Sequence, residues 1–164
     1  MWYLSDLCPV KREVTDMCQN WRLIELTNGN IGAVPAGSLL PIGAITRKVA
    51  QEPRCTPTFE VGTTQNNVVT VSEYGIYNVE YTGTLVAGAA GVLTLSLLAD
   101  GVAIATRSAT VTADGSFIFA LSKEIRVLKN CCNNVTPITL ALQISGVAIT
   151  GGNGTLILKR QAAV

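Results

Sequence analysis

The sequence predicts an all-β sandwich, and three features support this fold class. From residue 74 onward, short runs rich in β-branched, aromatic and aliphatic residues succeed one another at near-regular spacing. The pairs Asp100-Gly101 and Asp114-Gly115 separate three of these runs, and Asp-Gly pairs supply the positive φ angles that tight hairpins require. Within most runs apolar and polar residues alternate with a period of two, which is typical of strands that bury one face.

The expected strands can be placed in chain order. Two short ones are expected at 59–61 and 68–71, where the period of two begins. A longer strand at 74–81 has Tyr77, Val79 and Tyr81 on one face and more polar residues on the other. The remaining strands are expected at 92–98, 102–111, 117–128, 138–144 and 155–159, with the glycine-rich stretch 151–154 as the turn that opens the last.

Two of these strands are apolar on both faces. In the strand at 92–98, Leu93, Leu95 and Leu97 occupy one face, and the other face begins with valine and ends with leucine. The second face of the strand at 102–111 carries three alanines. A strand that is apolar on both sides is expected to be covered on both sides. A neighbouring subunit is the simplest cover, and a helix from the N-terminal segment is the alternative.

The composition agrees with an oligomer. Of the 164 residues, 48% are hydrophobic and only 14% are charged, whereas an average soluble domain has about 25% charged residues. A small exposed surface per chain explains this, and oligomerisation is the usual way to obtain one. No run approaches the roughly 18 apolar residues of a membrane-spanning helix, so membrane insertion is not expected. The net charge of +1 leaves no electrostatic footprint for nucleic acid.

The residues of the chain do not predict a catalytic centre. Histidine, the commonest general base and zinc ligand, is absent. The glycine-rich stretches 88–91 and 151–154 lack the lysine and the following helix of a phosphate-binding loop. We therefore expect a protein that is not an enzyme, with no cofactor and no metal site.

Five cysteines occur, at positions 8, 18, 55, 131 and 132. An odd number at irregular spacing does not indicate a disulfide framework. We expect free thiols in a reducing compartment, and a bridge from Cys55 to the Cys131-Cys132 loop is the alternative. The first residues lack the basic start and apolar run of a secretion signal, so folding in a cytoplasm is expected.

Residues 1–55 differ in character from the rest of the chain and are expected to form an N-terminal arm that is extended and partly helical, while 56–164 form the β domain. Pro9 suits a first helical turn, and apolar residues at helical spacing continue from it as far as Trp21. The stretch 33–45 mixes proline and glycine with apolar residues, so it either lies on another surface or packs back on its own sheet. Four arm residues are expected to dock on a partner: Trp2, Trp21, Leu39 and Leu40.

A jelly roll is one standard arrangement of about eight such strands, and an immunoglobulin-like sandwich is another. The stretch 75–81, with the pattern G-x-Y-x-V-x-Y, resembles a strand of the C1q and tumour necrosis factor superfamily of jelly rolls. The closing stretch 152–160 resembles the last strand of bacterial and phage members, including spore-surface collagen-like proteins and phage head fibres.

This resemblance implies a compact homotrimer whose strands pack around a threefold axis. The side chains expected to pack in that trimer are Tyr77, Val79, Tyr81, Leu93, Leu95 and Leu97. The collagen-like stalk of secreted members is missing, and the arm 1–55 stands in its place. This departure favours a virion protein over a secreted spore or complement role.

The expected function is therefore that of a structural phage virion protein. It would be a trimeric head fibre or capsid decoration protein, made in the host cytoplasm and attached to capsid or other virion proteins through the arm, with a host-surface glycan as a further ligand. The alternative is a receptor- or carbohydrate-binding module of a tail fibre, or of a protein on a bacterial cell or spore surface.

Overall fold

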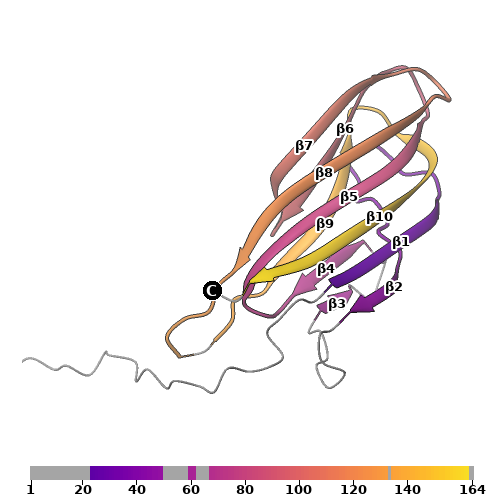
Figure 1. Cartoon of the computed structure of the whole chain (residues 1–164). Helices are drawn as coiled ribbons and strands as arrows, with labels where there is room; N and C mark the ends of the chain where they lie inside the picture. The colour runs from indigo at the N-terminus through magenta and orange to yellow at the C-terminus, as the bar shows by residue number, and fades with distance from the viewer. Residues whose placement is uncertain (1–22, 50–58, 62–66, 133, 163–164) are drawn as a thin grey trace, which may run out of the picture.

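The computed structural model describes residues 23–49, 59–61, 67–132 and 134–162, which form ten strands in two stacked antiparallel sheets (Figure 1). Sheet A has the strand order β2-β1-β10-β5-β8, and sheet B has the order β3-β4-β9-β6-β7. The predicted all-β jelly-roll sandwich is confirmed. The strands of sheet A are β2 (Ala44–Val49), β1 (Leu23–Ile31), β10 (Ile149–Ala162), β5 (Gly75–Ala87) and β8 (Ser116–Val127). Those of sheet B are β3 (Phe59–Val61), β4 (Val68–Val71), β9 (Ile138–Ser145), β6 (Gly91–Ala99) and β7 (Val102–Val111).

The hydrophobic core lies between the two sheets and is built from alternate residues of each strand. In β5, every second residue from Gly75 to Ala87 is buried, so the strand continues well past the predicted end at residue 81. In β6, Leu93, Leu95 and Leu97 face the core from the opposite sheet. The apolar residues of the alternating pattern are thus the ones that point inward from both sheets.

The two predicted Asp-Gly turns are confirmed by the backbone. Asp100 and Gly101 both have positive φ angles, of 49° and 80°, and Asp114 has a φ of 57°. The carboxylate of Asp100 also accepts hydrogen bonds from the backbone N–H and the hydroxyl of Thr139, at 2.8 and 3.0 Å. The β6–β7 hairpin is thereby fastened to the neighbouring strand β9.

The prediction that 151–154 is a turn is wrong, because this stretch lies inside β10. Its glycines have a packing reason instead. Gly154 pairs with Gly83 of β5, and a Cβ atom on either residue would overlap the buried hydroxyl of Tyr81. The two glycines therefore make room for a tyrosine ring within the core.

The predicted domain boundary at residue 55 is also wrong for the described part of the arm. Strands β1 and β2 belong to sheet A, and the connection between them packs back on its own domain rather than on another surface. Its Leu40 is fully buried and donates its backbone N–H to the carbonyl of Leu142 in β9 at 2.7 Å. Residues 1–22, with the predicted helix and both tryptophans, lie outside the described residues.

Candidate assembly and binding surfaces

The six side chains predicted to pack in a trimer lie in the core of a single chain. Tyr77, Val79, Leu93 and Leu95 are 0% exposed, and the other two are at most 3% exposed. They contact the opposite sheet of the same chain, so they have no free surface for a partner. Their placement at a subunit contact is corrected: the alternation identifies an inward face, and it cannot tell a core from an interface. Leu40 is buried as well, and of the predicted docking residues in the described part only Leu39 is half-exposed.

Of the five large apolar side chains that are exposed among the described residues, three lie on or next to the edge strands of sheet A, and the other two, Val92 and Val102, lie in sheet B. The edge strand β8 carries Ile118, which is 77% exposed, and Leu128, which comes directly after β8, is 63% exposed. The opposite edge strand, β2, carries Val49 at 38% exposed. Exposed apolar side chains therefore occur at both edges of sheet A.

The outer face of sheet A, between these edges, is mixed in character. One row across it runs from Glu25 through Ile157 and Glu80 to Ser122. The next row contains Thr27, Thr155, Thr82 and Ala120, and the Thr27 hydroxyl lies 3.4 Å from that of Thr155. Charged, apolar and hydroxyl groups are therefore interspersed on this face.

The outer face of sheet B carries a group of uncharged hydroxyl side chains over β6 and β7. Hydroxyl groups of β6 and β7 pair across it, Thr94 with Ser108 at 2.8 Å and Ser96 with Thr106 at 3.1 Å. In the described strands β4, β9, β6 and β7, no residue on the same face of the sheet as these hydroxyl groups is charged. The charged residue of β7, Arg107, pairs with Leu95 and belongs to the other set of positions.

Because these hydroxyl groups lie on the outer face, the prediction that β6 and β7 are apolar on both faces is only partly correct. Only the ends of the outer face of β6 are apolar, and these ends differ: Leu98 is 8% exposed, whereas Val92 is 53% exposed. Threonine and serine fill the middle of the face. The low fraction of charged residues is therefore explained partly by exposed hydroxyl groups, which carry no charge yet remain well hydrated.

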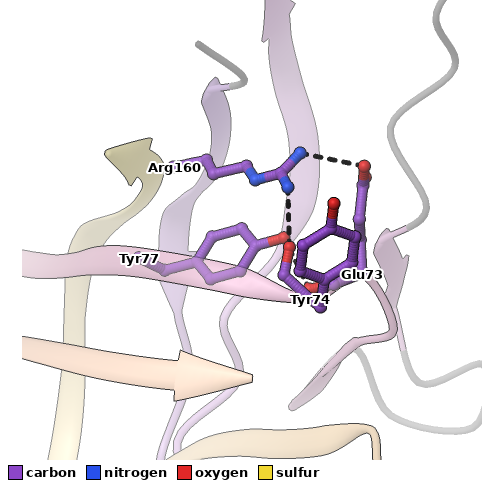
Figure 2. A network of polar contacts seen from close by, with 4 residues as sticks. All are labelled: Glu73, Tyr74, Tyr77 and Arg160. Atoms are coloured by element: carbon purple, nitrogen blue, oxygen red, sulfur yellow. Dashed lines mark hydrogen bonds and ion pairs between the residues drawn. The ribbon is translucent and has the colours of Figure 1, made fainter. Parts of the chain in front are cut away.

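A polar network that was not predicted from the sequence closes one end of the sandwich (Figure 2). Arg160, near the end of β10, is fully buried, and its Nη1 lies 2.9 Å from the carboxylate of Glu73. Its Nη2 donates a hydrogen bond of 2.7 Å to the carbonyl of Tyr74. The hydroxyl of Tyr77 donates to the carbonyl of Glu73 at 2.8 Å. The connection from β4 to β5, which crosses between the sheets, is thereby held against the last strand.

The ring of Tyr74 extends this network to a third segment. The Arg160 guanidinium lies 5.4 Å from the ring centroid, and the Lys129 ammonium, from the loop after β8, lies 3.9 Å from it. The signal for this site was present in the sequence, because Arg160 continues the inward positions of Leu156 and Leu158. An arginine at such a position needs a buried partner.

The loop after β8 projects beyond the ends of the strands and is closed by its own hydrogen bonds (Figure 1). Lys129 pairs with Val135, and the Asn130 side-chain oxygen accepts the backbone N–H groups of Cys132 and Asn134 at 2.9 and 3.0 Å. Cys131 and Cys132, at its tip, are free and exposed. The alternative bridge from Cys55 falls on a residue outside the described ones.

Within the described residues, no group of three or more cysteine, aspartate or glutamate side chains is arranged to hold a metal ion. The same part of the chain contains no helix long and apolar enough to cross a membrane.

Comparisons by sequence find no relative: no protein-family model and no curated protein matches the chain. Similar solved structures include the globular domain of zebrafish complement 1qA protein, with 8% identity over 85% of this chain and 98% of that chain and a TM-score of 0.55. Eiger TNF from S. frugiperda has 12% identity, coverage of 88% and 93%, and a TM-score of 0.55. Vertex protein P5 of phage PRD1 has 14% identity, coverage of 85% and 96%, and a TM-score of 0.52. At these identities the likeness shows a shared fold.

Proposed function

We propose that the chain is a structural virion protein of a phage, a homotrimeric head fibre or capsid decoration protein. In this proposal the jelly roll forms the trimer, the N-terminal residues attach it to the capsid or another virion protein, and no catalysis is involved. The fold is consistent with a structural or binding role, and a phage vertex protein is among the proteins that share it.

The observation that carries the proposal is the pair of exposed apolar edges on sheet A. Ile118 and Leu128 lie along one edge and Val49 along the other. Burying one side chain of this kind is worth about 1.5–3 kcal/mol. A contact between two different edges is head-to-tail, and such contacts form a closed ring when the rotation closes. A ring of three copies is the assembly that the family resemblance implies.

The mass of the protein in solution tests the trimer. Changing both Ile118 and Leu128 to aspartate is expected to reduce the native mass from three chains to one, because each copy would bring two charges into an apolar contact. The matched control is Val92→Asp, which changes an exposed valine on the outer face of sheet B and should leave a trimer. A monomeric wild-type protein, or a double variant that stays trimeric, would contradict the proposed assembly.

Attachment is assigned to residues 1–22, which precede β1 and include Trp2 and Trp21. In the full-length chain, changing both tryptophans to alanine is expected to abolish binding to purified phage particles while the trimer mass is retained. Undiminished binding would remove attachment through this segment from the proposal.

A second function, glycan or receptor binding, is favoured by the hydroxyl face of sheet B. Neutral hydroxyl pairs such as Thr94–Ser108 and Ser96–Thr106 can donate and accept hydrogen bonds toward a polyhydroxyl ligand. The Thr94→Val and Ser108→Ala double variant is then expected to lose binding on a glycan array. A module of this kind would also suit a tail fibre or a bacterial cell or spore surface. Particle binding that survives without glycan binding would favour the virion role alone.

A further inference from the structure

Two Asn-Gly pairs occur in the chain, and the structure gives them opposite surroundings. Asparagine is thermolabile, and it reacts most readily before glycine, because glycine has no Cβ to shield its backbone nitrogen from the asparagine side chain. Asn28-Gly29 lies at an irregularity of β1, whereas Asn153-Gly154 lies inside β10. We infer that Asn28 is a site of spontaneous deamidation and that the fold protects Asn153 from the same reaction. This inference goes beyond the proposed function and does not depend on the trimer.

The backbone at Gly29 lies outside the regular strand pairing. The pairing of β1 with β10 is regular as far as Asn28 and resumes at Ile31, so Gly29 and Asn30 have no register partner there. The pairing of β1 with β2 ends at Thr27. Gly29 is exposed, and apart from its chain neighbours no atom of the described residues lies within 4 Å of the place where a Cβ would stand. The Gly29 nitrogen therefore has room to move toward the side chain of Asn28.

The Asn28 side chain is held in the orientation that the reaction requires. Its Oδ1 accepts a hydrogen bond of 3.1 Å from the backbone N–H of Asn30, which folds the side chain over the following peptide bond. Cγ is thereby directed toward the Gly29 nitrogen. The Asn30 N–H also stabilises the negative charge that develops on Oδ1 when this nitrogen attacks. The site thus combines a nucleophile, an electrophilic carbon and a donor for the developing oxyanion.

Water is the only co-reactant that this reaction needs. The Gly29 nitrogen forms a bond to Cγ of Asn28, the bond from Cγ to Nδ2 breaks, and Nδ2 leaves as ammonia with the proton of the Gly29 nitrogen. The resulting cyclic imide then takes up one water molecule. Opening at one of its carbonyl groups gives aspartate, and opening at the other gives isoaspartate, which lengthens the backbone by one carbon atom.

Asn153-Gly154 lacks these features although its sequence is the same. Gly154 is buried and has register partners on both sides, Asn28 in β1 and Gly83 in β5. The Tyr81 ring fills the space beside the Gly154 Cα. Closing the cyclic imide here would pull the Gly154 nitrogen out of line between two paired strands, so the reaction requires local unfolding of β10.

Deamidation of Asn28 weakens the attachment of the connection between β1 and β2. Nδ2 of Asn28 donates a hydrogen bond of 3.2 Å to the carbonyl of Pro41, which lies between the buried residues Leu40 and Ile42. A carboxylate only accepts hydrogen bonds, so the product turns two oxygens toward the Pro41 carbonyl and repels it. The added negative charge also lowers the formal net charge from +1 to 0. Asn28 therefore marks the age of a molecule and loosens its fold at one defined place.

The site is tested by ageing the full-length protein. Samples are kept at a mildly alkaline pH with and without urea, and their peptides are analysed at intervals by chromatography and mass spectrometry. In the folded protein we expect Asn28 to convert to aspartate and isoaspartate while Asn153 stays intact, and in urea we expect both to convert at similar rates. Gly29→Ala, for which the fold has room, should slow the conversion of Asn28 in the folded protein at least several-fold.

The structural consequence is tested with Asn28→Asp. This variant is expected to unfold at a lower urea concentration than the unmodified protein, because it loses the hydrogen bond to the Pro41 carbonyl. Asn153→Asp is the matched control: it adds the same charge at an exposed position of the neighbouring strand and should unfold together with the unmodified protein.

Three outcomes contradict the inference at different points. If Asn28 stays intact in the folded protein and converts only in urea, the fold protects it and the inference is overturned. Equal conversion of Asn28 and Asn153 in the folded protein overturns the protection of Asn153. Equal stability of Asn28→Asp and Asn153→Asp removes the effect on the connection. The proposed function depends on native mass and particle binding, which are measured separately.

Discussion

Arg160 and Tyr81 are both buried in the core, and they differ in what surrounds them. The Nη atoms of Arg160 reach the Glu73 carboxylate and the Tyr74 carbonyl, and Nε is the one nitrogen of that side chain without a partner. Tyr81 lies between Gly83 and Gly154, and its hydroxyl is buried without any hydrogen-bond partner. Arg160 connects segments far apart in the sequence, whereas Tyr81 fills space.

The difference shows that a polar side chain can be buried in this fold for two reasons: to link distant segments, as Arg160 does, or to fill space, as Tyr81 does. The arginine network fixes the end of the sandwich from which the loop after β8 projects. Tyr81 contributes its ring to packing, and its hydroxyl is a cost that the fold tolerates. Four measurements can test this contrast.

The largest effect is expected for Arg160→Ala. Removing one member of a buried ion pair leaves the other charge and a carbonyl without their partner, which typically costs about 3–5 kcal/mol. The free energy of unfolding, from urea titration at a fixed protein concentration, should fall by this amount. Arg126→Ala is the control, because Arg126 pairs with Glu124 at 3.6 Å in an exposed setting and should cost about 0–1 kcal/mol. Equal losses in the two variants would show that burial of Arg160 adds nothing.

Gly154→Ala is expected to have the next largest effect. The added methyl group would overlap the Tyr81 ring, which is only 3% exposed and cannot easily move away. Such overpacking typically costs about 1–3 kcal/mol. Gly29→Ala, where no atom lies within 4 Å of the added Cβ, is the matched control and should show little change in urea unfolding. A tolerated Gly154→Ala would mean that Tyr81 is not confined.

How far the sequence predicted this core depends on the residue. The alternation of Tyr77, Val79 and Tyr81 indicated their inward direction, and the Asp-Gly pairs located two hairpins. The glycines of β10 were misinterpreted, because glycine serves both turns and close packing, and only the cross-strand neighbour decides between them. Strand β1 was missed because it pairs with β10, which is distant in sequence, and β2 was missed because it is an edge strand with mostly exposed residues.

The candidate surfaces were predicted less well, for a related reason. Periodicity assigns a side chain to a face, but whether that face meets the other sheet or another copy depends on packing between distant segments. Ile118 is apolar and lies at the edge of sheet A, which no local pattern reveals. Arg160 could have been identified from its place in line with Leu158, although its partner Glu73 lies 87 positions away in the chain.

The third prediction concerns pH. Burial raises the pKa of Tyr81 above the ordinary value of about 10. Above that pH the unfolded chain releases the proton and the folded chain keeps it, so stability is complete below about pH 10 and falls as the pH rises. At pH 11 this group should cost about 1.4 kcal/mol. The measurement is urea unfolding at pH 9 and pH 11, and Tyr81→Phe should show a smaller decrease by that amount. Parallel pH curves for the two proteins would contradict a desolvated hydroxyl.

The smallest effect is expected for Tyr81→Phe at neutral pH. Because the hydroxyl has no partner in the fold, its removal gives up no hydrogen bond and relieves a buried polar group, so stability should stay the same or rise by about 0–1 kcal/mol. Tyr77→Phe provides the contrast on the same strand face, since it deletes the hydrogen bond to the Glu73 carbonyl and should cost about 0.5–1.5 kcal/mol. Urea unfolding of both variants at pH 7 compares them directly. If Tyr81→Phe is as damaging as Tyr77→Phe, the Tyr81 hydroxyl has a partner such as an internal water, and the contrast with Arg160 disappears.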